Sequence, residues 1–140
     1  MVRNILIPVG PYTEPDPLLR IIDLVSGISG AMITLLGVIT IPAVTAINED
    51  EVKELKQYQE LSSHLDYVER MFVDMGLRNV KKKIIVSRDV PTAIIEEVAA
   101  GDYDLLVLAK RRKPPLVVRR SVSKSVIPKV FIPVLVLTMD

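Results

Sequence analysis

The sequence predicts an α/β protein with a doubly wound, five-stranded, mostly parallel sheet and helices on both faces. Two observations predict this class: short apolar runs alternate with helix-like segments, and most runs are continuously rich in Val, Ile and Leu. Strands covered on both faces have that composition. The length of 140 residues suits a single domain, residues 1–140, with one hydrophobic core.

Five apolar runs are expected to form the strands, and four segments between them the helices. The expected strands are Asn4 to Val9, Met32 to Thr40, Lys83 to Ser87, Asp104 to Ala109 and Ile132 to Thr138. The expected helices are Asp16 to Gly27, Asn48 to Gly76, Pro91 to Ala100 and Ser121 to Val130. Asp16 before Pro17 is a typical helix start, and Asn48 with Glu51 three residues later fits a capping box.

The long second helix is expected to bury one apolar stripe. Its members recur at helical spacing: Val52, Leu55, Leu65, Val68, Phe72 and Met75. His64 lies in the same helix, and we interpret it as a solvated or hydrogen-bonded surface group rather than a catalytic base. Asp102 and Asp104 come before the fourth strand, at the amino edge of the sheet, and are interpreted as turn residues.

Composition excludes several classes of site. The chain has no cysteine and one histidine, so disulfides, a thiol nucleophile and zinc or haem ligation are not expected. The net charge of +1 gives no global attraction to nucleic acid or to an acidic membrane. The first residues lack a cleavage site, and no apolar run reaches the ~20 residues that span a bilayer. We therefore expect a cytoplasmic protein that makes no membrane contact.

The loops after the first and fourth strands are where a ligand is expected. In a doubly wound sheet, the strand order reverses there and leaves a crevice at the carboxyl ends. The first loop runs from Gly10 to Pro15, and the fourth from Lys110 to Ser121. The fourth is strongly basic, with Lys110, Arg111, Arg112, Lys113, Arg119 and Arg120.

Several segments, in matching order and spacing, resemble the universal stress protein family over nearly the whole chain. NILIPV and LLGVIT are similar to the family's first two strands, and VPTAIIEEVAAGDYDLLVLA is similar to its third helix and fourth strand. SVSKSVIPKVFIPVLVL resembles the closing helix and strand. The resemblance implies a Rossmann-like fold of the adenine nucleotide alpha hydrolase-like kind. It also implies a homodimer that pairs the final strands of two copies.

One branch of that family binds ATP through a loop of the form G-x2-G-x9-G-S/T after the fourth strand. Glycines let backbone amides approach the phosphates. Here Ala109, Arg112 and Arg120 stand at the three glycine positions, with seven residues instead of nine between the last two. Pro114 and Pro115 remove two further N–H donors.

Other positions of the nucleotide site are partly kept. Gly10 stands where the ATP-binding branch has an aspartate at the end of the first strand. Val38 on the second strand, and Ser121, Val122 and Ser123 at the last helix, keep the residue types of the family. The serines are better explained as helix caps than as nucleophiles.

These residues support three hypotheses. The first is a non-enzymatic regulatory or protective stress protein without a bound cofactor, which has lost ATP binding by the usual loop. The second is a binding protein for a nucleotide or other phosphate ligand, or for an acidic protein, at Lys110 to Arg120. A solvated, mobile loop at Lys110 to Lys113 would explain the same basic residues without a ligand. The third is an ATPase or kinase-like activity, which is disfavoured because Glu14 and Asp16 are the only carboxylates in or directly beside the two loops. Mg²⁺-dependent turnover that survives their substitution would contradict that argument.

Two expectations about partners accompany these hypotheses. A homodimer is expected through Ile132 to Thr138, because this run is apolar and lacks the charges that protect an edge strand. An interior position in the sheet, or cover by a loop, would explain the same run. Extended nucleic acid is disfavoured, because two phenylalanines and no tryptophan leave few platforms for base stacking.

Overall fold

The structure, a computed structural model, describes residues 2–10, 13–26, 30–41, 51, 55–111 and 122–139. The strands are β1 (Asn4–Pro8), β2 (Met32–Thr40), β3 (Val80–Ser87), β4 (Leu105–Arg111) and β5 (Val134–Met139). The helices are α1 (Pro15–Ser26), α3 (Lys56–Asp74), α4 (Val90–Ala100) and α5 (Val122–Val126), followed by the 3₁₀ turn η1 (Ile127–Lys129).

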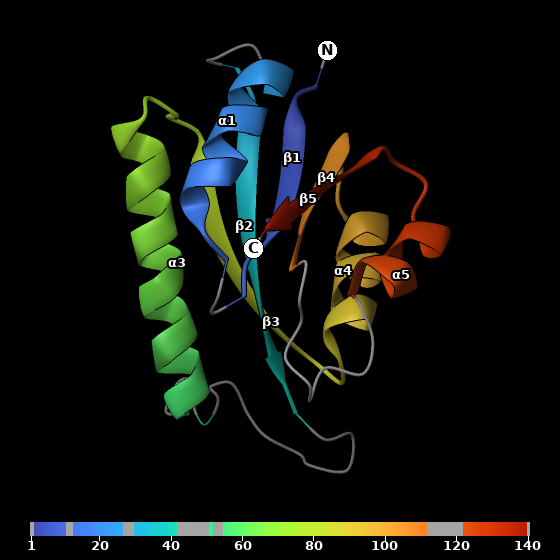
Figure 1. Ribbon diagram of the computed structural model, residues 1–140. Helices are drawn as coiled ribbons and strands as arrows, with labels where there is room; N and C mark the ends of the chain where they lie inside the picture. The colour runs from blue at the N-terminus through green and yellow to red at the C-terminus, as the bar shows by residue number, and fades with distance from the viewer. Residues whose placement is uncertain are drawn as a thin grey trace.

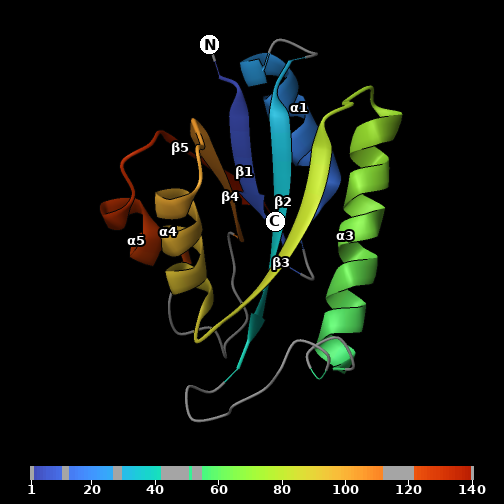
Figure 2. The same cartoon turned by 180° about the vertical axis from the view of Figure 1, so that it is seen from behind.

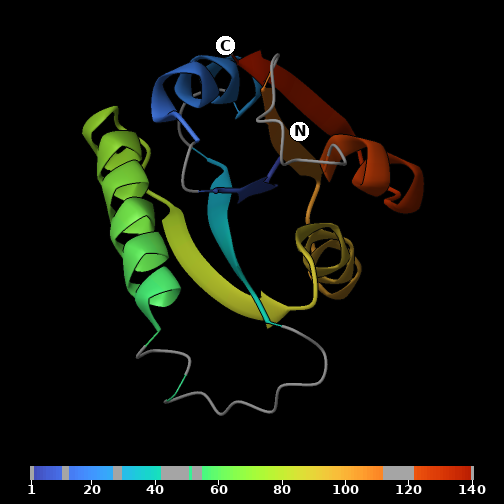
Figure 3. The same cartoon turned by 60° about the horizontal axis from the view of Figure 1, so that its bottom comes forward.

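The five strands form one sheet in the order β3-β2-β1-β4-β5, with every neighbouring pair parallel (Figure 1). The predicted doubly wound fold class is therefore confirmed. The helices α1 and α3 cover one face, and α4 and α5 cover the other, as the view in Figure 3 shows. The strand order reverses at β1, which pairs with both β2 and β4.

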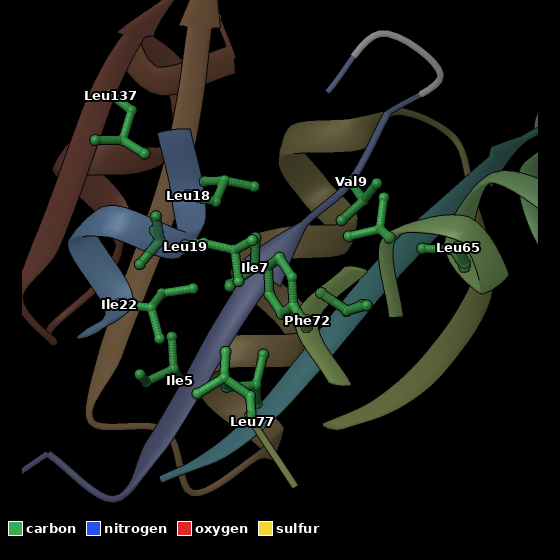
Figure 4. Packing of buried hydrophobic residues seen from close by; sticks show 14 of the residues in the cluster. Ile5, Ile7, Val9, Leu18, Leu19, Ile22, Leu65, Phe72, Leu77 and Leu137 are labelled. Carbon is green, nitrogen blue, oxygen red and sulfur yellow. The ribbon is translucent and has the colours of Figure 1, made fainter. Parts of the chain in front are cut away.

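Alternate residues of the strands feed two hydrophobic clusters. Ile5 and Ile7 of β1 point toward α1 and α3, where Leu18, Ile22 and Phe72 are almost fully buried (Figure 4). On the other face, a smaller cluster forms beneath α4 and α5, made up of Leu6, Leu36, Ile94, Leu106, Leu108 and Val126. There is thus one hydrophobic core on each face of the sheet, because successive side chains of a strand point to opposite faces.

A glycine allows α3 to approach the sheet closely. A Cβ placed on Gly37 of β2 would lie 2.8 Å from Cδ2 of Leu61 and 3.0 Å from Cδ1 of Leu65. Both leucines are buried, so a larger residue at this position would push α3 outward.

Two strands are longer than the apolar runs predicted. β3 begins at Val80 and not at Lys83, because an edge strand bonds on one side only and tolerates lysines that reach solvent or acids. β4 continues through Lys110 and Arg111, which pair with Thr138 and Met139 of β5. Lys110 and Arg111, the first two residues of the predicted basic loop, therefore belong to a strand.

The predicted ends of several strands and helices were wrong by a few residues. Val9 falls just outside β1, although its N–H still bonds the carbonyl of Leu36 at 2.8 Å. The last helix changes to a 3₁₀ turn at Ile127, since Pro128 lacks an N–H and disfavours helical geometry in the residue before it. β5 begins at Val134, one residue after Pro133. The final helix and strand are thus shorter at these ends than predicted.

The long second helix needs the largest correction. Within the described part, α3 starts at Lys56, while Asn48 and Val52 lie outside the described residues. Met75 follows the helix and is 57% exposed, so it does not belong to the buried stripe. Gly76 has φ of +97°, a conformation that favours glycine, and it turns the chain away there.

Candidate ligand site at the carboxyl ends of the strands

The connection from β1 to α1 is closed by its own hydrogen bonds. The Gly10 N–H donates to Oγ1 of Thr13 at 3.0 Å, and the Thr13 N–H donates to the Gly10 carbonyl at 3.2 Å. Gly10 is half-buried and directly follows the paired end of β1, at the point where the strand order reverses. The described part of the first loop thus borders the crevice where a doubly wound sheet binds ligands.

A histidine from α3 reaches the same connection. Nε2 of His64 lies 3.2 Å from the carbonyl oxygen of Thr13, and the imidazole is half-buried. The ring centroid of Tyr67, one helical turn on, is 6.1 Å away. Of the two roles expected for His64, a solvated or a hydrogen-bonded group, the structure shows the hydrogen-bonded one.

The other predicted site residues are divided between the two faces of the sheet. Val38 of β2 is half-buried on the α4 and α5 face, and Ser123 of α5 is buried there. Ala109 follows Val107 by two residues along β4, so its side chain points to the α1 and α3 face. Arg112, Arg120 and Ser121 lie outside the described residues.

Among the residues that the structure describes, the most deeply buried carboxylate lies elsewhere, between β3 and α4. The side chain of Glu97 is 9% exposed; Oε2 accepts a hydrogen bond from the Tyr103 hydroxyl at 2.7 Å, and Oε1 lies 2.9 Å from the Lys83 ammonium. Burial opposes its charge, but these two donors hold the pKa of Glu97 below its usual range. Burial and the Glu97 carboxylate together raise the pKa of Tyr103 to about 12.

This network has a structural role rather than a chemical one. A Cβ on Gly101 would lie 2.3 Å from the Tyr103 ring, so the glycine lets the ring fold back toward Glu97. Both donors and the acid are satisfied, and a tyrosine with so high a pKa stays protonated. The cluster ties the edge strand and the start of β4 to α4.

Asp104 is a turn residue, as predicted. Its Oδ2 accepts the N–H groups of Arg3 and Asn4, each at 2.9 Å. These bonds hold the pKa of Asp104 below its usual range. The carboxylate joins the starts of β1 and β4, at the amino edge of the sheet and away from the crevice.

Two kinds of site are not found in the part of the chain that the structure describes. Within those residues, no group of three or more His, Asp or Glu side chains is placed to hold a metal ion. None of the helices assigned there is long and apolar enough to cross a membrane.

Comparison with models of known protein families shows which family the chain belongs to. A model of the universal stress protein family matches residues 1–138. The chain belongs to the universal stress protein family. The predicted family resemblance is confirmed. No curated protein matches the sequence.

Solved structures of universal stress proteins share the fold at low sequence identity. One, in complex with cAMP, has 12% identity and a TM-score of 0.68, over 99% of this chain and 98% of that one. The protein from Archaeoglobus fulgidus in complex with dAMP has 16% identity and a TM-score of 0.68, over 97% and 98%. A family protein from Arabidopsis thaliana with AMP bound has 16% identity and a TM-score of 0.67, over 99% and 92%.

Proposed function

We propose that this protein is a non-enzymatic universal stress protein with a regulatory or protective role, which does not hold ATP through the usual glycine loop. One observation carries this proposal most directly. β4 continues to Arg111 and is paired with β5 up to that residue, so the residues between the first two glycine positions form a strand and not a turn. A phosphate-binding loop needs successive backbone N–H groups that point at the ligand, whereas the N–H groups of a strand alternate between its two sides.

The residues at the end of β1 support the same proposal. Gly10 brings no carboxylate to the place where the ATP-binding branch of the family has an aspartate, and its N–H is already bonded to Thr13. Glu14 and Asp16, the acids nearest in sequence, are exposed. Metal-assisted phosphoryl transfer needs carboxylates that hold the metal near the phosphates, so we propose no catalytic role.

A second candidate function is binding of a nucleotide or another phosphate ligand through the basic segment 110–120. The complexes of solved relatives with cAMP, dAMP and AMP favour it. β4 delivers Lys110 and Arg111 to the carboxyl edge of the sheet, and Arg112 and Lys113 follow in sequence. Guanidinium groups bind phosphate with two parallel hydrogen bonds. They can therefore replace the backbone amides of a glycine loop as hydrogen-bond donors to the phosphate.

Calorimetric titration with ATP and with AMP, each at 50 and 300 mM salt, separates the two candidates. The first predicts no saturable ATP binding at either salt concentration. The second predicts salt-sensitive AMP binding that falls at least about tenfold in the Arg112→Ala/Arg120→Ala double variant. The matched control is Arg20→Ala/Arg70→Ala, which removes two exposed arginines from α1 and α3.

The outcomes are distinct. Saturable ATP binding by the unmodified protein would overturn the first candidate. Equal loss of AMP binding in the two double variants would overturn the second, since a general charge effect would then explain the affinity.

We further propose a homodimer in which the β5 strands of two copies pair. β5 is an end strand of the sheet, so one side of its backbone lies outside the sheet. Phe131, three residues before β5, is fully exposed. An acidic protein partner for the basic segment also remains a proposal.

A further inference from the structure

One backbone acceptor lies just before α1. Thr13 is two residues before the first helical residue, Pro15, and helical hydrogen bonds begin only at the carbonyl of the residue directly before a helix. The Thr13 carbonyl therefore receives no N–H from α1. An oxygen in this position needs a donor from elsewhere in the fold when it is partly shielded from water.

The imidazole of His64 stands where that donor is needed. Its Nε2 lies 3.2 Å from the Thr13 oxygen. Because a carbonyl oxygen only accepts, Nε2 must carry the hydrogen, in either the neutral Nε2–H tautomer or the imidazolium. The tilted ring of Tyr67 packs beside the imidazole on the same helix.

We propose that His64 is a positioning residue: its Nε2–H donates to the Thr13 carbonyl and thereby holds the β1–α1 connection, at the border of the crevice, against α3. The inference rests on the proposed function in taking this crevice as the ligand site. Thr13 transmits the constraint, because its N–H and Oγ1 are both bonded to Gly10. A movement of α3 would therefore reach Gly10, the residue that replaces the family's aspartate.

The tautomer of the unmodified protein gives the first test. The chain has one histidine, so its imidazole nitrogens give one set of ¹⁵N signals. At a pH where the ring is neutral, the inference predicts the Nε2–H form. An Nδ1–H form would overturn it, since Nε2 could then not donate to Thr13.

Amide hydrogen exchange at Gly10 and Thr13 gives the second test. In His64→Ala, both amides should exchange about fivefold faster, because the loss of one hydrogen bond loosens the connection. His64→Gln should restore slow exchange, since its amide nitrogen is also three bonds from Cβ and also donates. Ser63→Ala, an exposed neighbour on α3, should leave both rates unchanged.

Equal exchange in the wild type and His64→Ala, or equal acceleration in the Ala and Gln variants, would overturn the inference. Neither test needs a ligand. Failed nucleotide titrations would therefore overturn the binding proposal alone, whereas unchanged exchange rates would overturn the positioning role alone.

Discussion

The two edges of the sheet, β3 and β5, are protected to very different extents (Figure 2). β3 carries three consecutive lysines, and neighbours along a strand point to opposite faces. Lys82 lies 2.5 Å from Oδ1 of Asp66 and 3.5 Å from Oε1 of Glu69, both on α3. Lys83 reaches Glu97 on α4. Charges thus tie this edge to the helices on both faces.

β5 has none of these features. The segment Val134–Met139 contains no charged residue, and the exposed Phe131 lies close to its start. Lysines on an edge strand oppose pairing with another chain, and an apolar edge without them permits it. The difference supports the proposed pairing of two copies through β5 rather than through β3.

Backbone geometry offers a direct test of that difference, with the largest expected effect. The carbonyl of Pro133 accepts from Leu106, so in alternation the backbone groups of Val134, Val136 and Thr138 point away from β4. Val136→Pro removes an outward N–H without removing a bond to β4. We expect the dimer dissociation constant to rise at least about a hundredfold, roughly 2.8 kcal/mol, in analytical ultracentrifugation.

The matched control lies on the other edge. The Asn79 carbonyl accepts from Ile33, and the Ser87 carbonyl accepts from Ile41, so the backbone groups of Val86 point outward. Val86→Pro should leave the association state unchanged. Dissociation by both proline variants would show that the edges are not used differently. Dissociation by Val86→Pro alone would place the contact between the two copies at β3 and would contradict the proposed β5 pairing.

The next largest effect is expected for the buried Glu97, which binds Lys83 of β3, on the stability of the fold. Glu97→Ala removes the acceptor of Tyr103 and the partner of Lys83, and we expect a loss of about 2 kcal/mol in the free energy of unfolding. Urea denaturation measures it. Glu96→Ala, at an exposed neighbouring position, should cost less than about 0.5 kcal/mol. Equal losses in both would mean that the network is not what holds β3.

The Glu97 network also predicts a pH dependence. Folding lowers the pKa of Glu97, so its charge contributes stability that is fully present above the unfolded pKa of about 4.3. This contribution is lost as the pH falls from there through the lowered pKa of the folded state. Glu97→Gln lacks the charge at every pH. The stability gap between wild type and Glu97→Gln should therefore close on acidification; a gap that widens would contradict the assigned ionisation.

The smallest effect is expected at the exposed lysine. The hydrogen bond that the Lys82 ammonium donates to Asp66 raises the pKa of Lys82, but the two side chains are 36% and 52% exposed. Lys82→Met should cost less than about 1 kcal/mol at low salt, and less still at 1 M salt. A larger loss that does not depend on salt would point to packing of the lysine stem instead.

The sequence predicted the fold class well because apolar runs dominate it. Met32–Thr40 was predicted with both ends correct, since this strand is covered on both faces and most of its residues are apolar. The start of β3 was missed, because Lys81 and Lys82 give no apolar signal where a strand is stabilised by ion pairs to helices.

The candidate site was predictable only in part. Its location followed from the strand order, and the replacement of the family glycines by Ala109, Arg112 and Arg120 was visible in the sequence. The bond between His64 and Thr13 joins residues 51 positions apart, so no local pattern reveals it.

Mass spectrometry of the purified protein, first native and then denatured, tests the central claim that the glycine-loop ATP site has been lost while the family fold is kept. The account predicts a native species of two 15.6 kDa chains that releases no ATP on denaturation. One ATP released per chain would contradict it, because the crevice would then bind the nucleotide without the glycines or the aspartate.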